Sequence, residues 1–309
     1  MRTSETGVIW RGLRKPNEEI LDERAVKDGA KFQKREAELA VMLALARYLV
    51  GSDDLHFGFW DNGLAVKLFN LPRAQERYSE FVLDHIPSGV QTVLDVGCGA
   101  GRMAARLVAR GYRVEGVTPS PLLAGETRKL LGDGFRVHEC RFEELSVEEQ
   151  YDVVYFGESF TYMQTEAALE KSVRCIREGG YLVICDFFRT EALGDSPLNG
   201  GPRLTRFREL AAAQPLELCE DIDITKETAP TLDLADELIT NVASPTWQIL
   251  MEGLQAKRPA ISWIGRRLMG KKIERFEKRY LRGAWSGSNF ERYKSYRLMV
   301  FRRTDNPPR

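Results

Sequence analysis

The residues best suited to chemistry lie in one short segment, Asp95 to Gly101, which reads D-V-G-C-G-A-G. The run Thr92 to Val96 has strand character, and a helical pattern follows the glycines, so we predict a turn between a strand and a helix. Glycines permit positive φ angles and let a ligand approach the backbone closely. Such a turn lies at the carboxyl end of its strand, where open α/β sheets bind ligands.

Two classes of cofactor are compatible with these glycines. The dinucleotide fingerprint G-x-G-x-x-G/A fails when it starts at Gly97, because it then reaches Arg102, but starting at Gly99 it reaches Ala104, which is tolerated. A nicotinamide cofactor is therefore not excluded. Asp95, two residues before the first glycine, favours instead a cofactor with a cationic amino-acid tail. A carboxylate attracts such a tail and repels a pyrophosphate.

Strand and helix patterns alternate around this segment. Strands are predicted at 92–96, 113–117, 135–139, 152–156, 181–185, 216–224 and 296–301, and helices at 36–50, 72–85, 103–110, 122–131 and 167–176, with a mainly helical stretch at 230–281. The alternation predicts parallel β-α-β units, and the apolar strands indicate a sheet covered on both faces. We therefore predict an α/β fold with a mostly parallel, seven-stranded sheet and helices on both faces.

We expect a single domain over residues 1–309. Its parts would be an N-terminal helical and lid segment at 1–88, a core at 89–226 and 294–304, and a helical acceptor-binding insertion at 227–293 before the last strand.

The bulk composition narrows the class of protein. Lys plus Arg and Asp plus Glu both total 45, so net charge gives no reason to expect a nucleic-acid partner. The five cysteines form no C-x-x-C pair and are odd in number, which favours free thiols in a reducing cytoplasm. No apolar run is long enough to span a membrane, residues 1–15 lack the apolar stretch of a secretory signal, and no compact metal-ligand spacing is present.

The glycine segment resembles motif I of class I S-adenosylmethionine-dependent methyltransferases. The resemblance covers roughly residues 80–190, because Gly116 to Ser120, Asp152 to Val154 and Arg177 to Leu182 follow in the family's order and spacing. It implies a Rossmann-like fold, S-adenosylmethionine as cofactor, and in-line methyl transfer to the oxygen, nitrogen or carbon of a small, lipophilic or natural-product-like acceptor.

The resemblance also implies a set of cofactor-binding positions. These are Trp60, Asp95, Gly97, Cys98, Gly99, Gly101, Thr118, Pro119, Ser120, Phe142, Glu143 and Gly157. Thr118 departs from the family, since many members carry Asp or Glu there to bind both ribose hydroxyls. Arg141 stands where an Asp often binds the adenine amino group, so adenine recognition is expected to fall to the backbone around Phe142.

The threonine after the second strand and the segment His56 to Trp60 resemble the branch of tocopherol and sterol methyltransferases and cyclopropane fatty acid synthases. The resemblance implies that this aromatic segment closes over the cofactor pocket, where aromatic faces attract a sulfonium cation. The alternative is that Phe57, Phe59 and Trp60 simply cap the core.

Three residues are candidates for catalysis: His56, Glu158 and Tyr162. In the resembled family the loop after the fourth strand faces the transferring methyl group, and it often carries a histidine where this chain has Tyr162. Tyrosine is a poor base at neutral pH, so His56 is the favoured histidine base. His85 and His138 fall at a helix end and in a strand, and we expect them to be structural.

Residues 257–282 form a strongly basic segment with interleaved apolar residues, which is typical of a helix that lies on an anionic lipid surface. The alternative is a solvated face over the core. Three other functions stay open: cyclopropane synthase-like lipid modification, a nicotinamide-dependent oxidoreductase, and a non-catalytic cofactor-binding protein. Modification of nucleic-acid bases is disfavoured, because no N-P-P-Y-type motif follows the fourth strand.

Overall fold

The computed structural model describes residues 23–61, 63–194, 196, 198–258 and 285–304, together with positions 263, 267, 270 and 274. The chain divides into two compact units, 1–41 and 42–309. Helix α1 (Glu23–Val50) runs across this boundary, and the other described elements belong to the second unit. Among the helices described, none has both the length and the apolar character that a membrane span requires.

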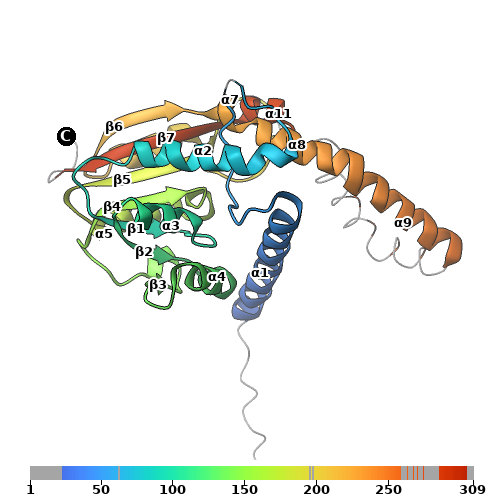
Figure 1. Ribbon diagram of the computed structural model, residues 1–309, viewed down its shortest axis with the longest axis horizontal. Helices are drawn as coiled ribbons and strands as arrows, with labels where there is room; N and C mark the ends of the chain where they lie inside the picture. The colour runs from blue at the N-terminus through green and yellow to red at the C-terminus, as the bar shows by residue number, and fades with distance from the viewer. Residues whose placement is uncertain are drawn as a thin grey trace, which may run out of the picture. The chain divides into compact units, whose positions relative to one another are not determined.

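The second unit alternates strands and helices along the chain (Figure 1). Its strands are β1 (Thr92–Val96), β2 (Arg113–Val117), β3 (Val137–His138), β4 (Tyr151–Gly157), β5 (Ile176–Arg189), β6 (Leu216–Asp223) and β7 (Lys294–Arg303). Its α-helices are α2 (Leu71–Asp84), α3 (Arg102–Ala109), α4 (Pro121–Leu131), α5 (Thr165–Cys175), α6 (Leu204–Ala212), α7 (Thr225–Thr228), α8 (Pro230–Leu238), α9 (Ser244–Lys257) and α11 (Gly287–Tyr293). Short turns of 3₁₀-helix are η1 (Leu68–Asn70), η2 (Phe142–Glu144) and η3 (Phe160–Tyr162), and η4 (Ile239–Ala243) is a π-helical turn.

The strands form one seven-stranded sheet in the order β3-β2-β1-β4-β5-β7-β6. The first five pair in parallel, whereas β7 runs antiparallel to both β5 and β6. The predicted α/β fold with a mostly parallel, seven-stranded sheet is confirmed. The chain leaves β1 in one direction toward β2 and returns on its other side as β4, so the topological switch point lies between β1 and β4.

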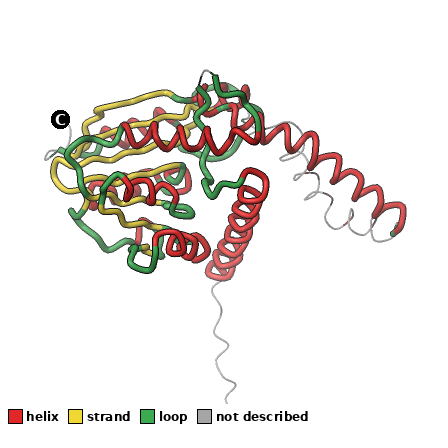
Figure 2. Tube along the Cα trace, viewed as in Figure 1, coloured by secondary structure: helices red, strands yellow, loops and turns green. Residues whose placement is uncertain are grey.

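Helices cover both faces of this sheet, as the layers in Figure 2 show. Val93 and Val153 face one side, where they pack with residues of α2 and α3. Their neighbours Leu94 and Val154 face the other side, where they pack with α5 and α6. This double covering explains why β1 and β4 carry mainly apolar residues on both faces.

The elements depart from the sequence expectations in four places, and the first is that helix α1 begins at Glu23 rather than at residue 36. Instead of an extended 135–139, β3 spans only Val137–His138. Strand β5 begins at Ile176 rather than 181, because Ile176 already pairs with Tyr151 of β4. The register then shifts before Tyr181 pairs with Val153, and Gly179 lies between them with a φ of +71°. Helix α6 was not predicted. The expected helical insertion before the last strand is present as α7, α8, η4, α9 and α11.

Candidate functional site

The glycine turn after β1 has three residues in the left-handed region, Gly97, Gly99 and Gly101, with φ of +79°, +58° and +84°. A Cβ at Gly97 would lie 2.3 Å from the Cβ of Ser159, and one at Gly101 would lie 2.9 Å from Thr127. A Cβ at Gly99 would meet nothing within 4 Å. Two of the glycines therefore allow close packing of protein on protein, and Gly99 faces open space.

The Asp95 carboxyl lies at the end of β1, just before this turn. It is 2% exposed, and its Oδ2 atom has no hydrogen-bond partner within the part of the chain that the structure describes. Burial without compensation raises the pKa of Asp95 to about 7. An acceptor atom left without a donor fits a ligand that brings its own, such as the ammonium of an amino-acid tail.

The loops after β1 and β4 contact one another at the switch point. Ser159 donates a hydrogen bond to the carbonyl of Val96, and the Gly97 amide donates to Val117 at 2.7 Å. Gly157 ends β4 beside them. The predicted cofactor positions of these two loops are thus brought together at the carboxyl ends of β1 and β4.

The predicted cofactor positions after β2 and β3 have other local roles. Thr118 accepts a hydrogen bond from the Ser120 amide at 3.2 Å, and the Ser120 hydroxyl accepts from Leu123 and caps α4. The Phe142 ring packs in the core, 5.3 Å from that of Phe156. Cys98 is buried in the glycine turn, whereas Pro119 and Glu143 are exposed.

The three aromatic residues Phe57, Phe59 and Trp60 pack against three different sets of side chains. Trp60 is 6% exposed and donates to the Thr231 hydroxyl at 2.9 Å. The Phe59 ring stacks on Phe81 at 5.0 Å. Phe57 packs against the rings of Phe187, Phe290 and Tyr296. This packing supports the core-capping alternative, and a lid role for the segment stays a prediction.

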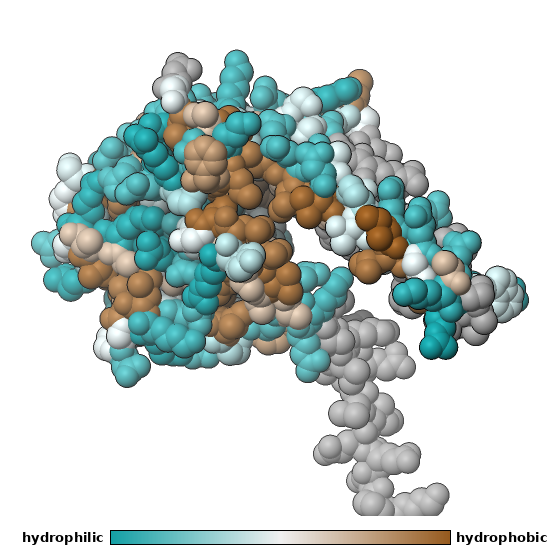
Figure 3. All heavy atoms as spheres, turned by 45° about the vertical axis from the view of Figure 1, so that its right-hand side comes forward, coloured by the Kyte–Doolittle hydropathy of each residue, from teal (hydrophilic) through white to brown (hydrophobic). Residues whose placement is uncertain are grey.

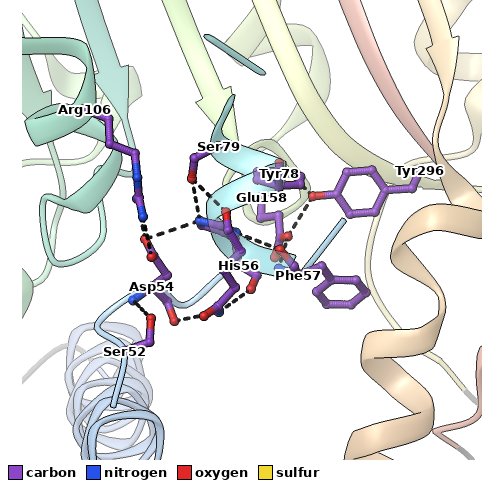
Figure 4. Close-up of polar contacts among 10 residues, drawn as sticks. Ser52, Asp54, His56, Phe57, Tyr78, Ser79, Arg106, Glu158 and Tyr296 are labelled. Atoms are coloured by element: carbon purple, nitrogen blue, oxygen red, sulfur yellow. Dashed lines mark hydrogen bonds and ion pairs between the residues drawn. The ribbon is translucent and has the colours of Figure 1, made fainter. Parts of the chain in front are cut away.

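Glu158 is the first residue after β4 and has a positive φ of +54°, which is unusual for a residue with a side chain. Its Oε1 atom accepts hydrogen bonds from the Phe57 amide at 2.6 Å and from the Tyr296 hydroxyl at 2.7 Å. The Tyr296 oxygen lies 2.9 Å from the Tyr78 hydroxyl. Figure 4 shows these contacts around Glu158. Burial raises the pKa of Glu158, and His56, Phe57 and Tyr296 oppose that rise.

His56 joins the same set of contacts from the other side (Figure 4). Its Nδ1 atom lies 2.8 Å from the Phe57 carbonyl, and its Nε2 atom lies 3.3 Å from Ser79 Oγ and 3.4 Å from Asp54 Oδ1. Two nitrogens of Arg106 contact the two carboxylate oxygens of Asp54, each at 2.8 Å. Burial would raise the pKa of Asp54, but Arg106 and His56 together hold it well below its usual range.

Tyr162, the third catalytic candidate, ends the turn η3 and is 66% exposed. Asp186, at the carboxyl end region of β5, is fully buried and accepts a hydrogen bond from the Thr161 amide at 3.1 Å, which fixes this turn. Of the three candidates, the structure joins Glu158 and His56 through Phe57.

Sequence reasoning missed Asp54, Tyr78, Arg106 and Tyr296. Asp54 stands two residues before His56, and that spacing was the one local signal that an acid accompanies the histidine. The residues of the described chain contain no cluster of three or more His, Cys, Asp or Glu able to hold a metal ion.

Comparisons with known proteins agree with this geometry. A family model described as a methyltransferase domain matches residues 94–184. O-methyltransferase resE of Aspergillus sclerotiorum is 26% identical over 184 residues, which are 56% of this chain and 67% of that protein. A putative sarcosine dimethylglycine methyltransferase from Galdieria sulphuraria shares the fold with a TM-score of 0.64 at 17% identity, over 85% of this chain and 98% of its own.

The geranyl diphosphate C-methyltransferase from Streptomyces coelicolor, solved with S-adenosyl-L-homocysteine, shares the fold with a TM-score of 0.62 at 18% identity, over 88% of this chain and 98% of its own. The matched family covers both the glycine turn and the Glu158 loop, the two parts that meet at the switch point. The cofactor is S-adenosylmethionine, and its cationic tail fits the Asp95 Oδ2 atom, which has no hydrogen-bond partner among the described residues. Residues 94–184 are therefore a methyltransferase domain of the class I S-adenosylmethionine-dependent type.

Proposed function

We propose that this enzyme methylates a hydroxyl group of a small, lipophilic acceptor, with Glu158 as the group that takes the hydroxyl proton. The carboxyl of Glu158, held at the end of β4 by Phe57 and Tyr296, is the observation that carries this proposal. The other two candidates, His56 and Tyr162, are less suited to take this proton. Both ring nitrogens of His56 already face oxygen atoms, and Tyr162 is largely exposed.

The environment of Glu158 suits a general base. Burial raises its pKa above the ordinary value of a glutamate, which increases the affinity of the carboxylate for a proton. The hydrogen bonds from the Phe57 amide and the Tyr296 hydroxyl both go to Oε1, so they fix the orientation of the carboxylate. Its left-handed backbone is a local strain of the kind found at functional sites.

S-adenosylmethionine supplies the methyl group on a sulfonium. Asp95 and the turn around Gly99 would hold its amino-acid part, and the protein's main contribution would be alignment and exclusion of water. As the acceptor oxygen forms its bond to the methyl carbon, the carbon–sulfur bond breaks and its electron pair stays on sulfur. The hydroxyl proton passes to the Glu158 carboxylate.

The surroundings of Glu158 favour a lipophilic acceptor. The rings of Phe57, Phe187 and Phe290 lie within 6.4 Å of one another, and those of Phe57 and Phe187 remain partly accessible. A wall of aromatic carbon next to one carboxylate is typical of sites for apolar small molecules that carry a single polar reacting group.

The test is Glu158→Gln, which keeps the size of the side chain and an oxygen that accepts hydrogen bonds. With a panel of phenols, aliphatic alcohols, amines, thiols and a monounsaturated acyl chain, we expect S-adenosylhomocysteine release for hydroxyl acceptors. The variant should lower kcat by roughly 10²–10⁴-fold while the affinity for S-adenosylhomocysteine is unchanged. Glu170→Gln, on the exposed side of α5, is the matched control.

Deuterated methyl donor separates the rival chemistries, because a methylated product retains three deuterium atoms and a cyclopropane retains two. Full activity of Glu158→Gln would refute the assignment of the base. Cofactor binding without turnover on any acceptor would instead favour the non-catalytic alternative.

We also propose that the insertion contacts an anionic lipid surface. None of the residues of α9 is buried, and Leu250 and Leu254 are 62% and 38% exposed. The spacing of Trp247, Leu250, Met251 and Leu254 places them on one face of the helix. Figure 3 shows apolar atoms exposed along this arm of the molecule. Cations follow this apolar face in the sequence. Most of the basic segment 257–282 lies outside the described residues, and Lys257, Arg258 and Arg267 are its described cations.

Vesicle sedimentation tests this contact. Vesicles containing phosphatidylserine should bind the wild-type chain, and neutral vesicles should not. Reversing the charge of Arg266, Arg267, Lys271 and Lys272 should abolish binding and change the acceptor KM. Unchanged vesicle binding and KM in that variant would show that the segment is only a solvated face.

We place the enzyme in the cytoplasm, because its five cysteines are free thiols and their pairing is not needed to close the fold. Fractionation of the producing cell tests this location.

A further inference from the structure

A chain of contacts runs from the helix after the glycine turn to the proposed base (Figure 4). Arg106 lies on α3, which begins directly after Gly101. It pairs with Asp54, Asp54 faces His56, and His56 contacts the Phe57 carbonyl. The Phe57 amide in turn donates to Glu158. Both polar groups of the Phe57 backbone are therefore held, the carbonyl by His56 and the amide by Glu158.

The hydrogen-bond partners of His56 define its protonation. Nδ1 faces a backbone carbonyl, which only accepts. Nε2 faces the Asp54 carboxylate and Ser79 Oγ, and the Ser79 hydroxyl already donates to the Gln75 carbonyl at 3.0 Å. Acceptors thus surround both nitrogens, and an imidazolium that donates from both satisfies all of them.

We propose that Arg106, Asp54 and His56 form a positioning relay that keeps His56 doubly protonated and holds Phe57 so that its amide binds and helps to ionise Glu158. The relay rests on the proposed role of Glu158. Its charges also balance, because Arg106 and His56 carry two positive charges against those of Asp54 and Glu158. His56 is then a positioning residue and not the group that takes the proton.

Several other groups surround Glu158 and His56. Around Glu158 these are Tyr155 on β4, Cys185 and Asp186 on β5, Tyr78 on α2 and Tyr296 on β7. Tyr78 also stacks on His56 with ring centroids 4.5 Å apart. Since the phenols and the thiol are neutral near pH 7, the charges that act on Glu158 are those of His56, which stabilises its ionised form, and of any ionised Asp186, which opposes it.

The first test reads the protonation of His56 directly by long-range ¹H–¹⁵N NMR of the imidazole rings. The chain has three histidines, so the His56 signals are assigned by their loss in His56→Gln. We expect both nitrogens of His56 to be protonated at pH 7 in the wild type. In Asp54→Asn we expect the ¹⁵N signal of His56 Nε2 to change, because this nitrogen loses the carboxylate that it faces. A neutral His56 at pH 7 in the wild type would overturn the relay.

The second test follows Glu158 by infrared difference spectroscopy between the wild type and Glu158→Gln. Its carboxylate band should titrate about one pH unit higher in Asp54→Asn and in His56→Gln. Asp152→Asn is the control, because it removes an ion pair with Arg177 at the opposite end of β4 from Glu158 and should leave the Glu158 titration unchanged. His56→Gln carries this test if Asp54→Asn fails to fold.

Turnover supplies the functional result. The acidic limb of kcat should move up with the Glu158 titration, giving about tenfold lower kcat at neutral pH with the acceptor KM unchanged. Arg106→Lys, which retains the charge, should recover most of the activity lost in Arg106→Gln. Lower thermal stability with no movement of the Glu158 band would show that the three residues only stabilise the fold. The two spectroscopic tests need no acceptor, so they separate failure of the relay from failure of the proposed function.

Discussion

At the scale of single residues, the protonation of Asp95 should control how tightly the site binds a ligand with a cationic tail. Its pKa of about 7 means that the carboxyl is mostly neutral below pH 7 in the ligand-free enzyme. A cationic amino-acid tail binds the ionised form better, so the affinity for S-adenosylhomocysteine should rise as the pH increases from about 5.5 to 7.5. The rise should be up to about tenfold per pH unit, and calorimetry at several pH values measures it.

Asp95→Asn is the matched control for this pH dependence. Its affinity should be lower than that of the wild type and nearly independent of pH over the same range, because the side chain no longer titrates. NADH should bind neither protein. A wild-type affinity that stays flat from pH 5.5 to 7.5 would show that Asp95 does not pair with the cofactor.

Gly97 and Gly99 separate folding from binding within one turn. Gly97→Ala places a Cβ 2.3 Å from Ser159 at a φ of +79°, so it should destabilise the fold by about 2–4 kcal/mol. Gly99→Ala meets no neighbour and should cost only about 1–2 kcal/mol, from its left-handed backbone. Gly99→Ala should nevertheless weaken cofactor binding tenfold or more by calorimetry, because its Cβ enters the open space over the turn. Unchanged binding would place the cofactor elsewhere.

At the scale of elements, Ser120 caps α4 through the Leu123 amide. Ser120→Ala should lower the free energy of unfolding by about 1 kcal/mol, and Ser120→Asn should restore it, because asparagine is also a good N-cap. Ser286 caps α11 in the same way, so Ser286→Ala should cost a similar amount without changing S-adenosylhomocysteine affinity. Urea denaturation and calorimetry measure both effects. Equal loss of cofactor affinity in the two variants would argue against a role for α4 in the site.

The elements that sequence patterns predicted well are those with a single dominant environment. Strands β1 and β4 are buried on both faces, so their apolar runs are continuous and their bounds were predicted within one residue. The short edge strand β3 has no such run. The start of β5 was missed because pairing with β4 shifts register around Gly179, and glycines there indicated a turn.

At the scale of the whole molecule, the site combines a local motif with distant contacts. The glycine turn is encoded within a few residues, so the cofactor class was predictable from sequence. Asp54 and Arg106 are 52 positions apart, and Tyr78 and Tyr296 are 218 apart. Only the three-dimensional fold brings such residues together, and a single sequence holds no periodic signal for them.

Buried acidic side chains at the site set how the stability of the ligand-free enzyme depends on pH. Folding raises the pKa values of Asp95, Glu158 and Asp186. Their contribution to the free energy of unfolding is therefore complete below their unfolded pKa values near 4. It is lost as the pH rises through their folded pKa values, of which that of Asp95 is about 7. Folding lowers the pKa values of Asp54 and Asp152, so their contribution is lost as the pH falls below about 4. Stability should therefore be highest at about pH 4, where these opposing contributions cross.

Thermal unfolding between pH 4 and 7.5 tests this expectation. The Tm of the ligand-free wild type should fall from about pH 5 to pH 7.5, with each such acid contributing about 1.4 kcal/mol per pH unit between its two pKa values. Asp95→Asn should flatten that decline, and saturating S-adenosylhomocysteine should reduce it, because the bound ammonium stabilises the ionised carboxylate. Lys294 does not interfere, since burial lowers its pKa only to about 8. A ligand-free Tm that is highest at pH 7 or above would mean that these carboxyls are ionised without cost, and that the site is open to water before the cofactor binds.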